Sequence, residues 1–218
     1  MNDYLTTLPI ETEQKPKIII RKSADAPAQI KDNPFFDVEI FGMAKDTENI
    51  YLPDSDEAIS FAIAAHEVGH LTREGAPPEE EAQLDNFEAT QKEEQRAWDN
   101  GWQYLKKYLS DYFVDSPEAV QQIEQLVYQI RDLLMVAVNT SKSMYLEKGT
   151  LSSLDEAEID AKLKEQRQKF FSSTEGQKFL ELFTEVKRKK IGKKPNWEKF
   201  VKVVTLAIED ILKDNEKL

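Results

Sequence analysis

The sequence predicts an α+β fold in which a small antiparallel or mixed sheet packs on a buried helix and a mostly helical half follows. Segments with the β-branched and aromatic content of strands occur only before Pro53. After Pro53, apolar residues recur at helical spacing to the end of the chain. The first helical segment, from Ala58 to Leu71, is apolar on nearly every side, which is typical of a central, buried helix.

Three segments have the pattern of strands: Pro16–Ser23 (PKIIIRKS), Phe35–Gly42 (FFDVEIFG) and Asn49–Pro53 (NIYLP). The turn-forming sequence KDTEN lies between the last two segments, so we expect those two to form a hairpin. The sequence therefore predicts a sheet of few, short strands at the start of the chain.

A helix is predicted to begin after Pro53, because Asp54 stands three residues before Glu57 in the spacing of a capping box. Its apolar residues form one stripe of Ile59, Ala62 and Ile63 and a second stripe of Phe61, Ala65 and Val68. A long second helix is expected to end near Phe113. Four more are expected to begin at Ser116–Pro117, Asp155, Thr174 and Asn196. These patterns divide the chain into residues 1–113, which carry the strands and the buried helix, and a helical extension, residues 114–218.

Charge and composition limit the classes of function. The net charge is −12, and residues 1–113 hold 23 acidic and 11 basic residues whereas residues 114–218 hold 18 of each. An acidic first half repels phosphate backbones, which argues against nucleic-acid binding. The chain has no cysteine, which excludes disulfides and thiolate metal sites. We find no bilayer-spanning apolar run and no signal-peptide pattern, so we expect a cytoplasmic protein without a membrane partner.

Both histidines of the protein lie in the pentapeptide His66-Glu67-Val68-Gly69-His70, on the predicted buried helix. Four residues of helix turn through about 400°, so the two imidazoles emerge on one face about 6 Å apart and can reach one zinc ion. Glu67 points about 100° away from His66, where a carboxylate can accept a proton from a metal-bound water. Burying two imidazoles without partners costs free energy, and a metal removes that cost. The pattern therefore predicts zinc ligands at His66 and His70.

The third ligand must be a carboxylate, because the chain has no other histidine or cysteine. Glu94 is the first candidate, since it shares the inward stripe of the long helix with Phe87, Trp98, Leu105 and Leu109. Gly101, two turns further on, would let the histidine helix approach closely. Glu93 is the second candidate, and Glu88 and Asp99 follow it. Alternatively, Glu94 lies at the margin of the stripe and reaches solvent or Arg96.

These residues resemble the gluzincin branch of the zincin metallopeptidases. The resemblance consists of HEVGH on a helix and, 24 residues after His70, the sequence Glu94-Gln-Arg-Ala97-Trp98, and it covers residues 35–110. Minimal gluzincins and the metalloprotease domain of ImmA/IrrE-like regulators are the nearest in style. Trp98 stands where those families usually have aspartate, so the carboxylate contact to a histidine would come from elsewhere, with Asp99 as a candidate.

The resemblance implies that residues 1–113 form a zincin-like catalytic domain that hydrolyses peptide bonds of a peptide or protein substrate. Glu67 would act as general base and then as proton donor, and an edge strand from residues 35–53 would pair with the substrate. The hydroxyls of Tyr104, Tyr108 and Tyr112 are candidates for stabilising an oxyanion, although tyrosines at helical spacing more often pack in a core.

The sequence is also compatible with two other hypotheses. One is a metal-stabilised regulatory or interaction protein whose zincin site is degenerate or activated by a partner. The other is a helical bundle with an accidental motif. Residues 114–218 are open to three roles: a lid, a dimer surface or a docking surface for a protein partner.

Overall fold

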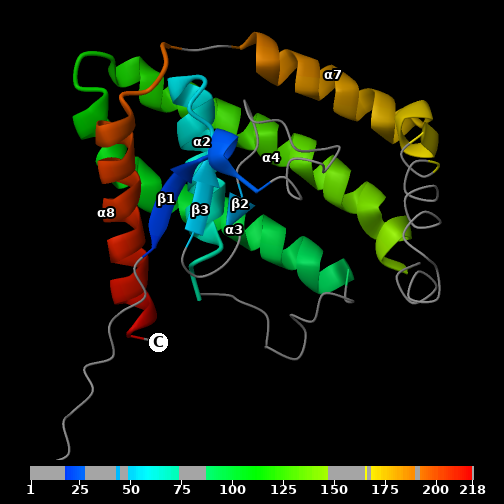
Figure 1. Ribbon diagram of the computed structural model, residues 1–218, viewed down its shortest axis with the longest axis horizontal. Helices are drawn as coiled ribbons and strands as arrows, with labels where there is room; N and C mark the ends of the chain where they lie inside the picture. Colours follow the sequence, from blue (N-terminus) through cyan, green and yellow to red (C-terminus); the bar gives the residue numbers. More distant parts are fainter. Residues whose placement is uncertain are drawn as a thin grey trace, which may run out of the picture.

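The computed structural model describes residues 18–27, 43–44, 49–73, 87–146, 165, 168–189 and 192–217. The structure is mostly helical, and a small sheet of short strands precedes the long helices (Figure 1). The predicted combination of a small sheet and a helical remainder is therefore confirmed. The elements are β1 (Ile19–Lys22), the 3-10 turn η1 (Ser23–Asp25), β2 (Met43–Ala44), β3 (Asn49–Leu52), α2 (Glu57–Gly69), α3 (Phe87–Tyr112), α4 (Pro117–Leu146), α7 (Thr174–Arg188) and α8 (Trp197–Asn215).

The described strands form one sheet in the order β1-β3-β2. β1 pairs with β3 in parallel, with Ile19 opposite Asn49, so the wholly antiparallel alternative is wrong. β2 is antiparallel to β3, with Met43 opposite Tyr51, and it lies on one edge of β3. β1, which comes much earlier in the chain, therefore takes the other edge of β3. The predicted strand at residues 35–42 lies outside the described residues.

Helix α2 begins at Glu57, with Asp56 as its N-cap. The Asp56 carboxylate accepts hydrogen bonds from the backbone N–H groups of Ala58 (3.0 Å) and Ile59 (3.2 Å). The predicted capping role of Asp54 is therefore wrong. The Asp54 carboxylate instead pairs with the ammonium groups of Lys22 (2.8 Å) and Lys194 (3.2 Å) from β1 and from the segment before α8.

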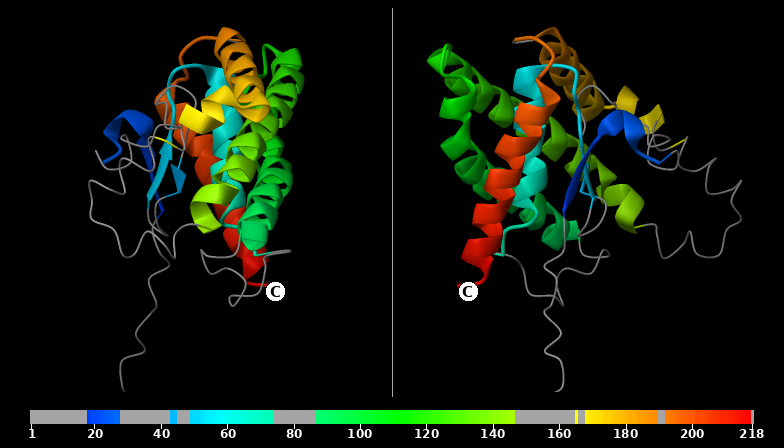
Figure 2. Two further views of the ribbon diagram at one scale, coloured as in Figure 1. Left: turned by 90° about the vertical axis from the view of Figure 1, so that its right-hand side faces the viewer. Right: turned by 60° about the vertical axis from the view of Figure 1, so that its left-hand side comes forward.

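All thirteen residues of α2 are buried, as the apolar stripes on several sides predict. The helix packs against α3, α4 and α8 and against β2 and β3, and Figure 2 shows the sheet on one side of the helices. Its last helical residue is Gly69, two residues before the predicted end at Leu71. His70 therefore lies just beyond the regular helix, in a tight turn closed by the hydrogen bonds from Leu71 N to Val68 O and from Thr72 N to Gly69 O.

Helices α2 and α3 cross in direct backbone contact at two glycines. A Cβ atom added to Gly69 would lie 1.8 Å from the carbonyl oxygen of Ala97, and one added to Gly101 would lie 1.8 Å from that of Ala65. Only glycine fits at both positions. The predicted role of Gly101 is confirmed, and Gly69 has the matching role on the other helix.

The helices after residue 113 share one hydrophobic core with α2 and α3. This core includes Leu105 of α3, Ile123 of α4 and Phe200 of α8, and the rings of Phe61 and Phe200 lie 4.8 Å apart. The predicted starts at Pro117, Thr174 and Asn196 are confirmed, the last as the N-cap of α8. The predicted helix start at Asp155 lies outside the described residues, although residues 168–172 are helical. The boundary at residue 113 thus falls in the turn between two helices of this core.

None of the described helices combines the length and the apolar character needed to cross a membrane.

Candidate metal centre

Helices α2 and α3 bring together the three side chains that the sequence predicts as metal ligands. His66 Nε2 lies 3.2 Å from His70 Nε2 and 3.2 Å from Glu94 Oε2, and His70 Nε2 lies 3.9 Å from the same oxygen. Four tetrahedral ligands at about 2.0 to 2.1 Å from a zinc ion lie about 3.3 to 3.4 Å from one another. The two distances of 3.2 Å are close to this spacing and the distance of 3.9 Å exceeds it by about 0.5 Å, so these two histidines and one glutamate could hold a single ion.

The chemistry of these atoms also fits a cation. A neutral imidazole carries one N–H, and an ionised carboxylate only accepts hydrogen bonds. One proton on His66 Nε2 can therefore serve either His70 Nε2 or Glu94 Oε2, but not both. A metal ion serves all three donor atoms at once. Within the described part of the chain, these three residues are the only group of histidine, aspartate or glutamate side chains close enough to hold an ion.

Glu94 faces the histidines and is largely buried, with 23% of its side chain accessible to solvent. Burial alone raises the pKa of the Glu94 carboxyl, but the hydrogen bond with His66 and the nearby charge of both histidines outweigh it and lower the pKa. The alternative in which Glu94 reaches Arg96 is wrong, because the Arg96 guanidinium contacts Glu93 and Thr72 instead.

Glu67 lies beside the three donor atoms without belonging to them. Its Oε1 is 4.0 Å from His66 Nε2, and only 4% of the residue is exposed. A carboxylate at this place is close enough to reach a water molecule held at the cluster, while its own oxygen stays outside the ligand set.

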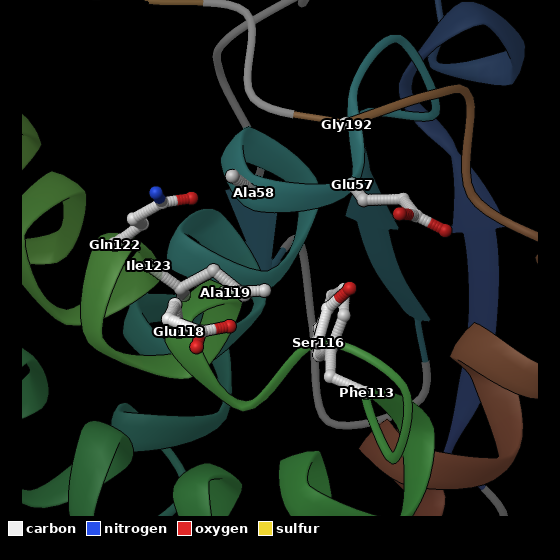
Figure 3. Close-up of a pocket in the computed structure, with 9 residues that line it drawn as sticks. All are labelled: Glu57, Ala58, Phe113, Ser116, Glu118, Ala119, Gln122, Ile123 and Gly192. Atoms are coloured by element: carbon white, nitrogen blue, oxygen red, sulfur yellow. The ribbon is translucent and has the colours of Figure 1, made fainter.

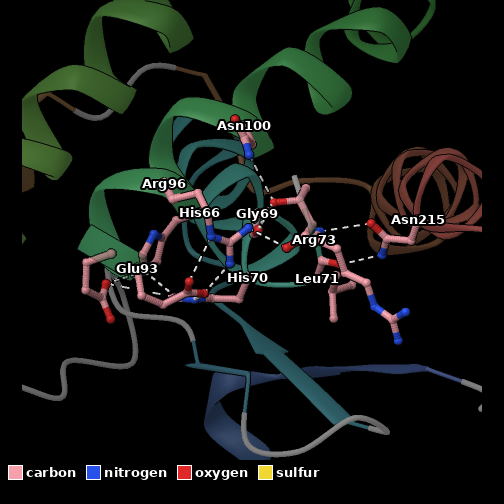
Figure 4. Close-up of polar contacts among 11 residues, drawn as sticks. His66, Gly69, His70, Leu71, Arg73, Glu93, Arg96, Asn100 and Asn215 are labelled. Atoms are coloured by element: carbon pink, nitrogen blue, oxygen red, sulfur yellow. Dashed lines mark hydrogen bonds and ion pairs between the residues drawn. The ribbon is translucent and has the colours of Figure 1, made fainter. Parts of the chain in front are cut away.

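The outer nitrogen of His70 has a carboxylate partner. His70 Nδ1 lies 3.2 Å from Glu93 Oε1, and Glu93 also pairs with the Arg96 guanidinium (Figure 4). Burial raises the pKa of Glu93, but the hydrogen bonds with His70 and Arg96 bring it down to about 2. An ionised acceptor at Nδ1 keeps the ring proton there and leaves Nε2 free for a metal.

Sequence reasoning ranked Glu93 as a second candidate ligand and missed this contact. Glu93 meets the nitrogen of His70 that faces away from the cluster, so it supports a candidate ligand instead of replacing Glu94. Asp99, the sequence candidate for the contact to a histidine, bonds to Gln95 and lies 3.9 Å from Arg131. The one hint in the sequence was Arg96, which lies three residues after Glu93 on the same helix face and could therefore be expected to pair with it.

The ring of His66 is fixed in a different way. It stacks on the indole of Trp98, with 4.4 Å between ring centroids and an interplanar angle of 20°. His66 is 5% exposed, and its Nδ1 has no hydrogen-bond partner among the described residues. Trp98 therefore orients the His66 ring by stacking and not by a hydrogen bond.

The three tyrosines after Glu94 take part in packing between elements. Tyr104 donates to Asp214 and Tyr108 to Asp210, both on α8, whereas Tyr112 donates to Glu57 at the start of α2. Each hydroxyl is therefore engaged away from the donor cluster, in agreement with the packing alternative.

Comparison of the chain with protein-family models, with curated proteins and with solved structures finds no match. The resemblance to gluzincins thus depends on the HEVGH motif, Glu94 and their geometry.

Proposed function

We propose that this protein is a zinc-dependent metallopeptidase of the gluzincin type, in which His66, His70 and Glu94 hold the zinc ion. The observation that carries the proposal is the convergence of His66 Nε2, His70 Nε2 and Glu94 Oε2 within 3.2 to 3.9 Å of one another. When bound, zinc polarises the carbonyl of the scissile peptide and acidifies a water molecule.

Glu67 is the general base of the proposed reaction. Its buried carboxylate takes a proton from the attacking water and then passes it to the amine of the leaving peptide. The position 4.0 Å from His66 Nε2 supports this role, because the proton acceptor must lie next to the ligands without being one. Burial strengthens the interaction between the carboxylate and any positive charge at the site.

A peptide substrate is supported by the sheet that packs on α2. Both β2 and β3 contact α2, and β2 is an edge strand among the described residues. An extended peptide can add to such an edge through backbone hydrogen bonds. The proposal thus includes a zincin-like arrangement of the sheet and α2, with the substrate along the edge that contains β2.

Glu67→Gln tests the proposal most directly. Tag-free protein loaded with zinc is assayed against a quenched-fluorescence peptide library and an unfolded protein. We expect the variant to bind zinc as the unchanged chain does and to lose about 10²- to 10⁴-fold in kcat, the usual contribution of a general base.

Glu57→Gln is the matched control, because Glu57 is also a buried glutamate of α2 but lies at the other end of the helix. This control should keep full activity. Undiminished turnover by Glu67→Gln would contradict the role of Glu67.

The second candidate function is a regulatory or interaction protein stabilised by the metal. The lack of a partner for His66 Nδ1 among the described residues favours it, because a histidine ligand in an active zinc site usually donates its other N–H. Stoichiometric zinc in a chain that cleaves none of the substrates would support this function over hydrolysis.

A further inference from the structure

His70 occupies a position that α2 alone does not fix. It follows the last residue of the regular helix, and the backbone around it continues into the tight turn that Leu71 and Thr72 close onto Val68 and Gly69. Helix ends fray unless other groups hold them. The backbone position of His70 therefore depends on contacts to residues 71–73, while Glu93 contacts its ring directly.

Helix α3 holds this turn from one side. Arg96 donates to both the carbonyl and the hydroxyl oxygen of Thr72, and Asn100 donates to the same hydroxyl at 3.2 Å. The Thr72 hydroxyl in turn donates to Gly69 O at 2.8 Å. Arg96 also pairs with Glu93, so the contact of Glu93 with His70 and the anchoring of Thr72 share one guanidinium.

Helix α8 holds the turn from the other side through a single side chain. Asn215 accepts a hydrogen bond from Arg73 N at 2.9 Å and donates one to Leu71 O at 2.8 Å (Figure 4). Its amide thus bonds to the backbone on both sides of Thr72, as a neighbouring strand would. These two contacts join positions 142 and 144 residues apart in the sequence.

The same end of α8 is tied to α3. Asp214 accepts a hydrogen bond from Tyr104, and Asp210, one turn earlier, accepts one from Tyr108. The last two turns of α8 therefore contact α3, which supplies Glu94, and the segment that follows His70. Among these contacts, only Asn215 reaches the segment that follows His70.

We infer that Asn215 is a positioning residue for the metal site, which acts by fixing residues 71–73 and through them the ring of His70. This inference rests on the proposed metal site and gives the C-terminal helix a task in it: α8 completes the frame of the site. The two hydrogen bonds of Asn215 close one side of the turn, and Arg96 and Asn100 close the other.

Zinc affinity, measured by competition with a chelator on folded, tag-free protein, tests the inference. Asn215→Leu removes both hydrogen bonds at similar volume, and we expect zinc binding to weaken about 10-fold, as for loss of an outer partner of a ligand. Asn215→Asp keeps the acceptor for Arg73 N and loses the donor to Leu71 O. The zinc affinity of this variant should therefore lie between those of the unchanged chain and of Asn215→Leu. Asn215→Asp also serves if the leucine variant does not fold.

Tyr108→Phe is the matched control, because it removes a hydrogen bond between α8 and α3 without touching residues 71–73. We expect this variant to bind zinc within about twofold of the unchanged chain, since distant substitutions act independently. Equal weakening by Tyr108→Phe and Asn215→Leu would overturn the inference, because the effect would then follow from the docking of α8 in general.

A second readout needs no metal. In the unchanged chain, ¹⁵N NMR of the metal-free protein should show His70 with its proton on Nδ1, facing Glu93, and Asn215→Leu should mix the two tautomers. Unchanged His70 signals together with unchanged zinc affinity in Asn215→Leu would overturn the inference. Failure of the unchanged chain to bind zinc would instead overturn the proposed function, and the NMR result would then decide the role of Asn215 by itself.

Discussion

Ionisable side chains face α3 at both ends of α2, but their polar atoms find different partners at the two ends. At the first end, Tyr112 donates to Glu57 at 2.9 Å, and Asn196 N donates to the tyrosine oxygen at 3.2 Å. At the second end, two imidazole nitrogens and a carboxylate oxygen face one another. At the first end, each of these polar groups has a hydrogen-bond partner in the protein. At the second end, the two imidazole nitrogens and the carboxylate oxygen all offer lone pairs, and there are too few N–H groups among them to bond to all three.

A pocket alone does not make a site, as the first end of α2 illustrates. A pocket of about 330 Å³ opens there, lined by Glu57, Ala58, Phe113, Ser116, Glu118, Ala119, Gln122, Ile123 and Gly192 (Figure 3). Figure 3 shows the carboxylates of Glu57 and Glu118 on opposite sides of it. Tyr112 donates a hydrogen bond to Glu57, and no cluster of metal-ligating side chains lies in this pocket among the described residues. In the described part of the chain, the candidate metal ligands lie at the other end of α2.

His70→Ala should have the largest effect on zinc binding, because it removes one of the three converging ligand atoms. We expect zinc affinity to fall by more than the roughly 100-fold that loss of an outer partner of a ligand can cause, and zinc should no longer raise the melting temperature. Chelator competition and thermal unfolding measure the two effects. Glu57→Gln, at the other end of the same helix, should bind zinc normally. Zinc binding by His70→Ala at the affinity of the unchanged chain would refute the ligand set.

Gly101→Ala should disturb the site and the fold together, because its Cβ would meet Ala65 O at 1.8 Å and push α3 away from α2. We expect a loss of about 3 kcal/mol in the free energy of unfolding, as in overpacked cores, and weaker zinc binding.

Gly192→Ala is the contrasting substitution, at the first end of α2. Gly192 has a φ of 99° and lies against Glu57, so the substitution should cost about 1 kcal/mol and leave zinc affinity unchanged. Urea unfolding and zinc titration of both variants check these effects.

Tyr112→Phe should affect only the first end, by removing the donor to Glu57. We expect the free energy of unfolding to fall by about 1 to 2 kcal/mol at pH 7, because a buried acceptor loses a partner. Burial and the hydrogen bond to Glu57 raise the pKa of Tyr112 to about 12. The stabilisation is therefore fully present below the ordinary pKa of 10 and is lost as the pH rises towards 12. Unfolding curves of both proteins should accordingly converge over that range, and a constant difference would contradict this account of Tyr112.

Asp54→Asn should have the smallest effect, and that effect should disappear at low pH. Burial raises the pKa of Asp54, but the hydrogen bonds and charges of Lys22 and Lys194 outweigh it and lower the pKa below 3.8. The ion pairs thus stabilise the fold above that pH and lose their contribution as the pH falls through the folded pKa. Because the lysines are exposed, we expect a loss of at most about 1 kcal/mol at pH 7, and the two proteins should become equally stable near pH 2. A larger difference at pH 2 than at pH 7 would reverse the assigned sign.

The sequence predicted the elements whose patterns are local. The apolar residues around α2 predict a central helix, and the spacing of His66 and His70 places both rings on one face. The inward stripe of α3 brings Glu94 to the histidines, since an amphipathic helix turns one face to the core. Gly101 marks the close crossing because it interrupts a pattern of large side chains.

The features that the sequence did not predict depend on contacts between distant segments. Asp54 and Asp56 are both good N-caps, and the pull of Lys22 and Lys194 on Asp54 decides between them. The parallel pairing of β1 with β3 follows from the route of the chain, which no local pattern encodes. Asn215 is an ordinary residue at a helix end until the fold brings it to Leu71 and Arg73.

X-ray absorption at the zinc edge of tag-free protein loaded with zinc tests whether His66, His70 and Glu94 hold the ion. We expect one zinc ion per chain, with the scattering of two imidazoles and with nitrogen and oxygen ligands at about 2.0 to 2.1 Å. His70→Ala should lose one imidazole from this signal or lose the zinc altogether. A chain that binds no stoichiometric zinc, or binds it without imidazole scattering, would contradict the central claim that the second end of α2 is a metal centre.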